Sequence, residues 1–425
     1  MLTKETINLI NQSSTKQHSQ EFESLAEKLT KERIDVETLL RQLEKFQIAV
    51  PSWALGAGGT RFGRFNFGGA PRTLLEKIED VGLLHALTKN SNAISLHIPW
   101  DIPEDIQEIK EAAIAQRLSF DAVNSNTFQD QVNQKHSYKY GSLSHADKAV
   151  REQAIAHNKE VIQIGESLGS KSITVWLADG SNFPGQNNFQ KSLYRTLDSL
   201  QEITKSMPKN WRLFIEYKPY EPNFYSTVIQ DWGTSFLLAN ACGPQAFTLV
   251  DLGHHLPNTN IEQIVATLLM QGKLGGFHFN DSKYGDDDLT VGSIQPYKLF
   301  LIFNELVYGM ATNKNNPPLA WMIDASHNNK DPLEDLLQSI DAILESFAKA
   351  LLIDQKALHQ AQQYNDVVMC QELLQNAFKT DVRPLIREIR LRKGGALDTL
   401  QVYRETKQRQ IRIQQRGVDA LSSGL

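Results

Sequence analysis

Short apolar segments alternate along this chain with longer amphipathic ones. Eight segments have the length and composition of buried strands: about 46–51, 93–98, 118–123 and 171–177, then parts of WRLFIEYKP, AFTLVDLGHH, LGGFHFND and PLAWMIDASH. Segments such as TLLEKIEDVGLLHALTK and NIEQIVATLLMQGKLG lie between them, with apolar residues at three- and four-residue intervals typical of helices. Strands that alternate with helices form parallel sheets, and eight of them predict a closed (β/α)8 TIM barrel.

The two ends of the chain are helical in pattern but lie outside the eight repeats. We expect an N-terminal helical arm at residues 1–45, a catalytic barrel at 46–330 and a C-terminal helical extension at 331–425. A long helical extension on a barrel enzyme commonly serves subunit packing, so we expect a homo-oligomer.

Composition narrows the class of protein. Of 425 residues, 41% are hydrophobic and 22% charged, which is ordinary for a soluble globular protein, and the net charge of −5 offers no general attraction for nucleic acid. No apolar stretch is long enough for a signal peptide or a membrane span, so we expect a cytoplasmic protein without a membrane partner. Cys242 and Cys370 are the two cysteines, and neither forms a C-x-x-C pair.

Four predicted strands in the second half end in metal-binding side chains: Glu216, Asp251, His278 and Asp324. Catalytic groups of such barrels gather where the strands end, so three carboxylates and one imidazole can converge on one cation. Carboxylate oxygens with one imidazole favour Mn²⁺, with Mg²⁺, Co²⁺ or Zn²⁺ as alternatives. A lone carboxylate in such a position is more often a helix cap or an ion-pair partner, but four on consecutive strands favour a metal site.

A second cation is expected beside the first. His254 follows Asp251 in LVDLGHH, and Asp286 and Asp288 lie in NDSKYGDDD after His278, where alternate carboxylates can point the same way. Glu216 can bridge the two cations. The DDD run can instead be a solvated acidic turn.

Five further side chains at the same rim are candidate substrate contacts: Trp53, Phe62, His97, Trp176 and Lys218. Lys218 shares the inward face of its strand with Glu216 and can polarise a substrate oxygen or simply neutralise surplus carboxylates. His97 ends the second strand, where a histidine is often a satisfied core residue. The tryptophans can wall a sugar pocket or pack in the core. Phe62 lies in SWALGAGGTRFGRFNFGG, which we expect to cover the pocket or reach a neighbouring subunit.

The strings IEYKPYEP, LVDLGHH, GFHFNDSKYGDDDL and MIDASHN, with HIPWD and GGTRFGRF upstream, resemble the bacterial L-rhamnose isomerase family of broad sugar specificity. This resemblance implies a xylose-isomerase-like barrel, two manganese ions and a homotetramer. It implies a structural metal site at Glu216, Asp251, His278 and Asp324, and a catalytic one at Glu216, His254, Asp286 and Asp288. It also implies substrate contacts from His97, Lys218, Trp53, Trp176 and a neighbouring subunit's Phe62.

We therefore expect an aldose–ketose isomerase that converts L-rhamnose to L-rhamnulose and accepts related aldoses, with Lys218, His97 and Asp324 as catalytic residues. The hydrogen on carbon moves either as a hydride or as a proton through an enediol, and a metal-assisted hydride shift is favoured because the nearby carboxylates are committed to metal. A sugar 3-epimerase is the main alternative, but it needs two free carboxylates and one metal. A metal-dependent apurinic endonuclease needs a basic groove, and a non-catalytic sugar-binding or scaffold protein has no need of this set of ligands.

Overall fold

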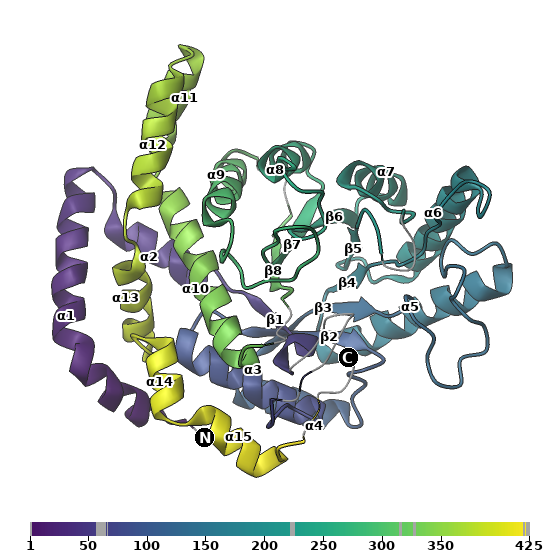
Figure 1. The fold of residues 1–425 in the computed structure, drawn as a ribbon, viewed down its shortest axis with the longest axis horizontal. Helices are drawn as coiled ribbons and strands as arrows, with labels where there is room; N and C mark the ends of the chain where they lie inside the picture. Colours follow the sequence, from purple (N-terminus) through teal and green to yellow (C-terminus); the bar gives the residue numbers. More distant parts are fainter. Residues whose placement is uncertain are drawn as a thin grey trace.

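Eight parallel strands form a closed barrel in the order of the sequence (Figure 1). The computed structural model describes residues 2–56, 65, 67–221, 226–313, 317–325, 329–419 and 421. The strands are β1 (Ala49–Pro51), β2 (Ala93–Ile98), β3 (Ser119–Ser125), β4 (Ser172–Val175), β5 (Arg212–Glu216), β6 (Ala246–Asp251), β7 (Leu274–Phe279) and β8 (Ala320–Ile323). The predicted TIM barrel is confirmed.

A ring of helices covers the outside of the strands. The ring contains α3 (Leu74–Thr88), α4 (Ile106–Ala115), α5 (Lys148–Leu168), α6 (Phe189–Ser206), α7 (Trp232–Cys242), α8 (Ile261–Met270), α9 (Pro296–Thr312) and α10 (Pro332–Leu351). A short 3-10 helix, η1 (Ser52–Leu55), follows β1. Helix α10 packs against both α9 and α3, so it closes the ring, and the expected boundary between barrel and extension at residue 330 stays a prediction.

The barrel interior is packed with side chains that alternate along the strands. Phe214 of β5 and Phe247 and Leu249 of β6 form a buried apolar cluster with Ala122 and Ala320. Because side chains of a strand alternate between its two faces, the residues two positions further on face the barrel axis at the carboxyl end. In β5 and β6 these positions are the ones predicted to bind metal.

The N- and C-terminal arms pack against each other on one side of the barrel, where α1 (Lys4–Lys31) and α2 (Val36–Lys45) contact α13 (Arg383–Lys393). The buried amide of Asn11 donates to Gly395 O at 2.9 Å and accepts from Leu397 N at 3.0 Å. His18 of α1 contacts Glu388 of α13 at 2.9 Å. These pairs fix the two ends of the chain to one another, and the predicted role of the extension in subunit packing stays a prediction.

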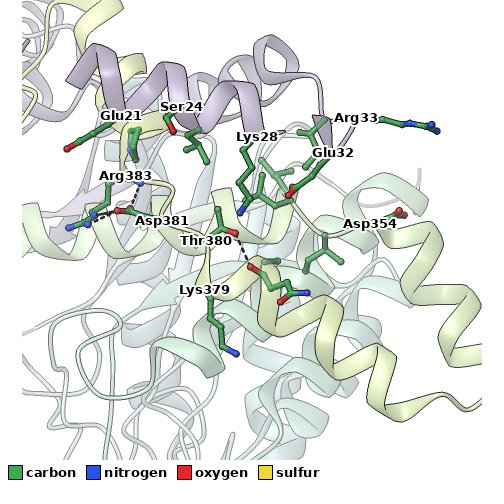
Figure 2. A pocket seen from close by; sticks show the side chains of 18 of the residues that line it. Glu21, Ser24, Lys28, Glu32, Arg33, Asp354, Lys379, Thr380, Asp381 and Arg383 are labelled. Carbon is green, nitrogen blue, oxygen red and sulfur yellow. Dashed lines mark hydrogen bonds and ion pairs between the residues drawn. The ribbon is translucent and has the colours of Figure 1, made fainter. Parts of the chain in front are cut away.

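The remaining helices of the extension are α11 (Gln355–Gln363), α12 (Val367–Lys379), α14 (Thr399–Glu405) and α15 (Gln408–Arg416). In Figure 1, α11 and α12 project away from the barrel, whereas α14 and α15 return to it beside α3. A polar groove of about 1610 Å³ lies between α1 and the ends of α12 and α13 (Figure 2). Its side chains include the ion pair of Arg383 with Asp381. Among the described residues no helix has the length and apolarity to cross a membrane.

Candidate metal and sugar site

Four side chains from consecutive strands meet at the carboxyl end of the barrel. Glu216 and Asp251 are the last residues of β5 and β6, His278 lies opposite Asp251 in the β6–β7 register, and Asp324 directly follows β8. Each offers one ligand atom, and these atoms all lie within 4.8 Å of one another. The convergence predicted from the sequence is therefore present, and this group, which we call the first ligand group, has the donor set and size to bind a metal ion.

His278 is the imidazole at the centre of the first ligand group. Its Nδ1 lies 3.2 Å from Glu216 Oε1, 3.5 Å from Asp324 Oδ2 and 3.8 Å from Asp251 Oδ2. Burial opposes a charge on this ring, but the carboxylates of Glu216 and Asp324 outweigh burial and raise the pKa of His278 well above its ordinary value. A cation bound here would compete with a proton for the ring nitrogen.

Asp251 is fully buried and only one of its oxygens is well satisfied. Oδ1 accepts hydrogen bonds from Gly253 N at 2.8 Å and from the Asn280 amide at 2.9 Å. Oδ2 accepts none from the described residues. Burial raises the pKa of Asp251 to about 7, with attraction to His254 opposing the shift and repulsion from Asp324 and Glu216 adding to it. A buried carboxylate oxygen without a donor is costly unless a cation pairs with it, so this atom fits a metal ligand.

His254 connects the first ligand group to further carboxylates. Its Nδ1 lies 3.0 Å from Tyr217 O and 3.3 Å from Glu216 Oε1, and its Nε2 lies 3.0 Å from Asp286 Oδ1. A carbonyl oxygen can only accept, so Nδ1 carries the hydrogen and Nε2 is the atom available to a metal. Although burial opposes it, attraction to Asp251 and Asp286 raises the pKa of His254 to about 9.

The three consecutive aspartates after β7, Asp286 to Asp288, have different partners. Asp286 and Asp288 have left-handed backbone conformations, with φ of 52° and 49°. Asp288 lies 3.5 Å from the Asn280 amide, and burial followed by the charges of Asp286 and Asp324 raises its pKa well above the ordinary value. Asp287 instead accepts from the backbone N–H of Lys283 and Tyr284. Asp286 and Asp288 thus lie at His254 and Asn280, whereas Asp287 binds the backbone of its own loop. The metal-binding role of Asp286 and Asp288 stays a prediction.

Lys218 supplies positive charge beside His254. Its Nζ lies 2.6 Å from Asp286 Oδ2 and 2.6 Å from Glu221 Oε2, and its side chain is 2% exposed. The ammonium group also lies 5.1 Å from the centre of the Trp176 ring. Lys218 is thus held at the rim by two carboxylates and one aromatic face, a position compatible with both interpretations made from the sequence.

Trp53 takes a role that its sequence position did not suggest. Its indole Nε1 donates to Asp324 Oδ1 at 2.9 Å, which orients a member of the first ligand group. The same ring lies edge-on to His97, with ring centres 5.4 Å apart. Trp53 therefore both walls the site and holds a carboxylate in place.

An aromatic wall runs from His97 to Trp176, the ring that faces Lys218. The ring of His97 stacks on that of Trp100, with ring centres 4.2 Å apart, and lies edge-on to Phe128, with ring centres 5.6 Å apart. The ring centres of Phe128 and Trp176 are 4.8 Å apart. Trp100 and Phe128 were not among the predicted contacts. Trp100 lies three residues after His97 in HIPWD, whereas nothing in the sequence near Phe128 distinguishes it. Phe62 lies outside the described residues.

This wall contains two buried polar atoms, one on an imidazole and one on an indole. His97 Nδ1 and Trp176 Nε1 are buried and make no hydrogen bond within the described part of the chain. Burial above all lowers the pKa of His97 to about 3, so the ring is neutral. A neutral imidazole and an indole N–H between apolar faces match a ligand that carries hydroxyl groups on a C–H framework.

Asp101 holds the backbone at His97. Its Oδ2 accepts from His97 N at 2.8 Å and from Ser52 Oγ at 2.5 Å, and its Oδ1 pairs with the buried Lys77 at 2.6 Å. Asp101 is the last residue of HIPWD, and its position in the sequence did not indicate this role. Its support joins the loops after β1 and β2, which only the tertiary structure brings together.

Comparison with known proteins agrees with this geometry. The model of the family described as xylose isomerase-like TIM barrel matches residues 87–324. A protein of Rhizobium meliloti named probable sugar isomerase is 50% identical over 404 residues, which are 95% of this chain and 94% of the relative. The chain belongs to the xylose isomerase-like TIM barrel family.

More distant likenesses are weaker. An L-rhamnose isomerase of Enterobacter is 26% identical over 287 residues, 60% of this chain and 66% of that protein. The narrower membership among L-rhamnose isomerases is not confirmed by this likeness and stays a prediction. The structure of 3-keto-D-glucoside 4-epimerase from E. coli covers 71% of this chain and 100% of its own at 13% identity with a TM-score of 0.50, which shows a shared fold.

Proposed function

We propose that this protein is an aldose–ketose isomerase that binds two divalent cations, most favourably Mn²⁺, and converts L-rhamnose to L-rhamnulose. The observation that carries the proposal is the contact of Glu216 Oε1 with both His278 and His254. One carboxylate thus joins the first ligand group to a second group, which suits a pair of cations.

The side chains divide between the two proposed cations. Glu216, Asp251, His278 and Asp324 would hold one, and Glu216, His254, Asp286 and Asp288 would hold the other. Bound cations supply Lewis-acid polarisation of the substrate carbonyl. This assignment is supported by Asp251 Oδ2, which accepts no hydrogen bond from the described residues, and by Nε2 of His254, which is available to a metal.

The chain's own residues bind and orient the sugar. Lys218 would donate to a substrate oxygen, and its two carboxylate neighbours keep its ammonium group in place. The neutral His97 would contact the sugar at the opposite wall and assist opening of the ring. Trp53 and Trp176 would pack on the C–H faces of the substrate and exclude water.

We assign the exchange between C1 and C2 to a hydride shift. The hydrogen on C2 moves to C1 with its electron pair, while the proton on the C2 hydroxyl passes to the oxygen on C1. The carboxylates near the site are committed to cations or to Lys218, so none is left as a base for an enediol route. Asp324, oriented by Trp53, is the carboxylate we assign to both metal binding and catalysis.

A sugar 3-epimerase is the alternative in the same family of folds. Such an enzyme needs two free carboxylates on opposite faces of one carbon, and the contact of His254 with Asp286 argues for a second cation instead. A metal-dependent apurinic endonuclease is disfavoured by the acidic and aromatic rim.

The test is incubation of manganese-loaded protein with a panel of aldoses and ketoses, with products separated by chromatography. We expect L-rhamnulose from L-rhamnose, and with L-rhamnose deuterated at C2 we expect the label at C1 of the product. A ketose changed at C3 without aldose formation would show an epimerase instead. Loss of the label to water would show an enediol route.

A further inference from the structure

The C-terminal helix α15 lies against two loops at the carboxyl end of the barrel. One loop follows β1 and contains Gly68 and Gly69, and the other follows β8 and ends at Asp331, the N-cap of α10. Since β1 pairs with β8 to close the barrel, these loops leave neighbouring strands. Figure 1 shows α15 beside α3, far in sequence from both strands.

Arg409 of α15 joins the two loops directly. Its Nε donates to Asp331 Oδ2 at 2.8 Å, Nη2 donates to Asp331 Oδ1, and Nη1 donates to Gly68 O at 3.1 Å. Tyr403 donates to the same Asp331 at 2.9 Å. The Arg409 side chain is 10% exposed, and its guanidinium lies over the ring of Phe67. A planar guanidinium with fixed donors is suited to such a link, and lysine cannot reproduce it.

The glycine pair allows α15 to approach without a gap. Gly69 has φ of +69°, and a Cβ there would lie 2.7 Å from Ile413 N. Gly69 N donates to Gly417 O at 2.9 Å, so the loop and the end of α15 are also joined through the backbone. No larger residue fits this contact without moving the helix or the loop.

The same two chain segments meet again inside the site. Trp53, after β1, donates to Asp324, after β8, at 2.9 Å. The hydrogen bond of Trp53 with Asp324 and the contacts of Arg409 with Gly68 and Asp331 therefore both connect the chain after β1 to the chain after β8, each through described residues.

We infer that α15 is a positioning element of the site, and that Arg409 sets the Trp53–Asp324 contact by fixing Gly68 to Asp331, the N-cap of α10, since α10 packs against the η1 segment that carries Trp53. The inference rests on the proposed function for its kinetic consequence. Its structural consequence concerns the hydrogen bond of one indole N–H and is independent of any substrate. The C-terminal extension would thus serve the metal centre as well as subunit packing.

The experiment compares the variants Arg409→Met and Gly69→Ala with the control Arg404→Met. Arg404 lies on α14 and binds Glu334 of α10 through two hydrogen bonds of 2.7 and 2.6 Å, and among the described residues it makes no hydrogen bond or ion pair with the loop after β1. The first readout is the indole N–H resonance of Trp53 in metal-free protein labelled at tryptophan and assigned with Trp53→Phe. The second readout is the Mn²⁺ dissociation constant by calorimetry.

Arg409→Met and Gly69→Ala should both shift the Trp53 resonance and weaken Mn²⁺ binding by about threefold or more, less than the loss expected for a direct partner of a ligand. If the enzyme is active, KM should rise more than kcat falls. Arg404→Met should match the wild type in all of these. Should Arg409→Met fail to fold, Gly69→Ala decides, since it keeps the Arg409 side chain.

A folded Arg409→Met protein with reduced thermal stability, an unchanged Trp53 resonance and unchanged Mn²⁺ affinity would overturn the inference and leave Arg409 a purely structural residue. Wild-type protein that binds Mn²⁺ but isomerises no sugar would refute the proposed function alone. If the wild type binds no Mn²⁺, the Trp53 resonance still decides between the two roles of Arg409.

Discussion

Replacing Glu216 by glutamine tests the metal centre at the point where its two ligand groups meet. The change keeps the shape of the side chain and removes one negative charge. Glu216 Oε1 lies 3.2 Å from His278 Nδ1 and 3.3 Å from His254 Nδ1, so both proposed cations should feel the loss. A variant that affected only one ion would contradict the bridging role.

The size of the effect follows from the compactness of the first ligand group. Two unit charges 4 Å apart interact by about 4 kcal/mol at an effective dielectric constant of about 20, and a divalent ion doubles this figure. The amide oxygen remains a ligand and the neutral side chain is less costly to bury, so we expect a net loss of about 3 to 4 kcal/mol. This loss corresponds to about 10²- to 10³-fold weaker binding.

The assay is calorimetric titration of Mn²⁺ into protein stripped of metal with a chelator. Glu221→Gln is the matched control, because it makes the same change in a carboxylate that binds Lys218 and is not a proposed metal ligand. The control should keep Mn²⁺ affinity within about threefold of the wild type. Equal losses in the two variants would mean that net charge alone governs binding, and wild-type affinity in Glu216→Gln would refute the proposed site.

Three further outcomes are expected. Lys218→Met should lower kcat/KM by about 10²-fold or more while metal content by atomic absorption stays unchanged, and an unaltered kcat/KM would remove Lys218 from the mechanism. Trp53→Phe keeps an aromatic ring in the wall of the site but removes the hydrogen-bond donor to Asp324, so the affinity for Mn²⁺ should fall by about tenfold. An affinity equal to that of the wild type would show that this hydrogen bond does not orient Asp324. Burial, then the charges of Lys89 and Arg117, lowers the pKa of His85 from 6.5 to about 4, so the unfolded chain binds a proton in this range while the folded chain does not. The free energy of unfolding should therefore fall as pH drops from 6.5 to 4. Measured by chemical denaturation, the His85→Gln variant should lose about 3 kcal/mol less over this range than the wild type. Identical pH profiles for the two proteins would contradict the lowered pKa of His85.

Strand positions were readable from the sequence because burial on both faces leaves short continuous apolar runs. The run at 93–98 coincides with β2, and the others differ from the observed strands mainly at their ends. The place of α10 in the ring of helices was not predictable from the sequence, because a helix has the same amphipathic pattern whether it closes a barrel or begins an extension. Its contacts with α9 and α3, which are long-range, decide its place.

The first ligand group was predictable for a related reason. Parallel strands of a barrel end at one rim, so a polar residue that closes each apolar run must lie near the others. Glu216, Asp251, His278 and Asp324 follow this rule, and the structure brings all four together. Alternation of side chains likewise placed Lys218 on the same side as Glu216.

The supporting contacts were decided by tertiary structure alone. The indole of Trp53 reaches Asp324 across 271 positions of sequence, and Arg409 reaches Gly68 across 341. Local periodicity reports which face of a strand or helix is buried, but it holds no information on which distant loop that face will meet. The sequence by itself therefore determined the barrel and the residues at its rim, whereas the folded chain determined which partners orient them, because those partners become neighbours only when β8 closes against β1.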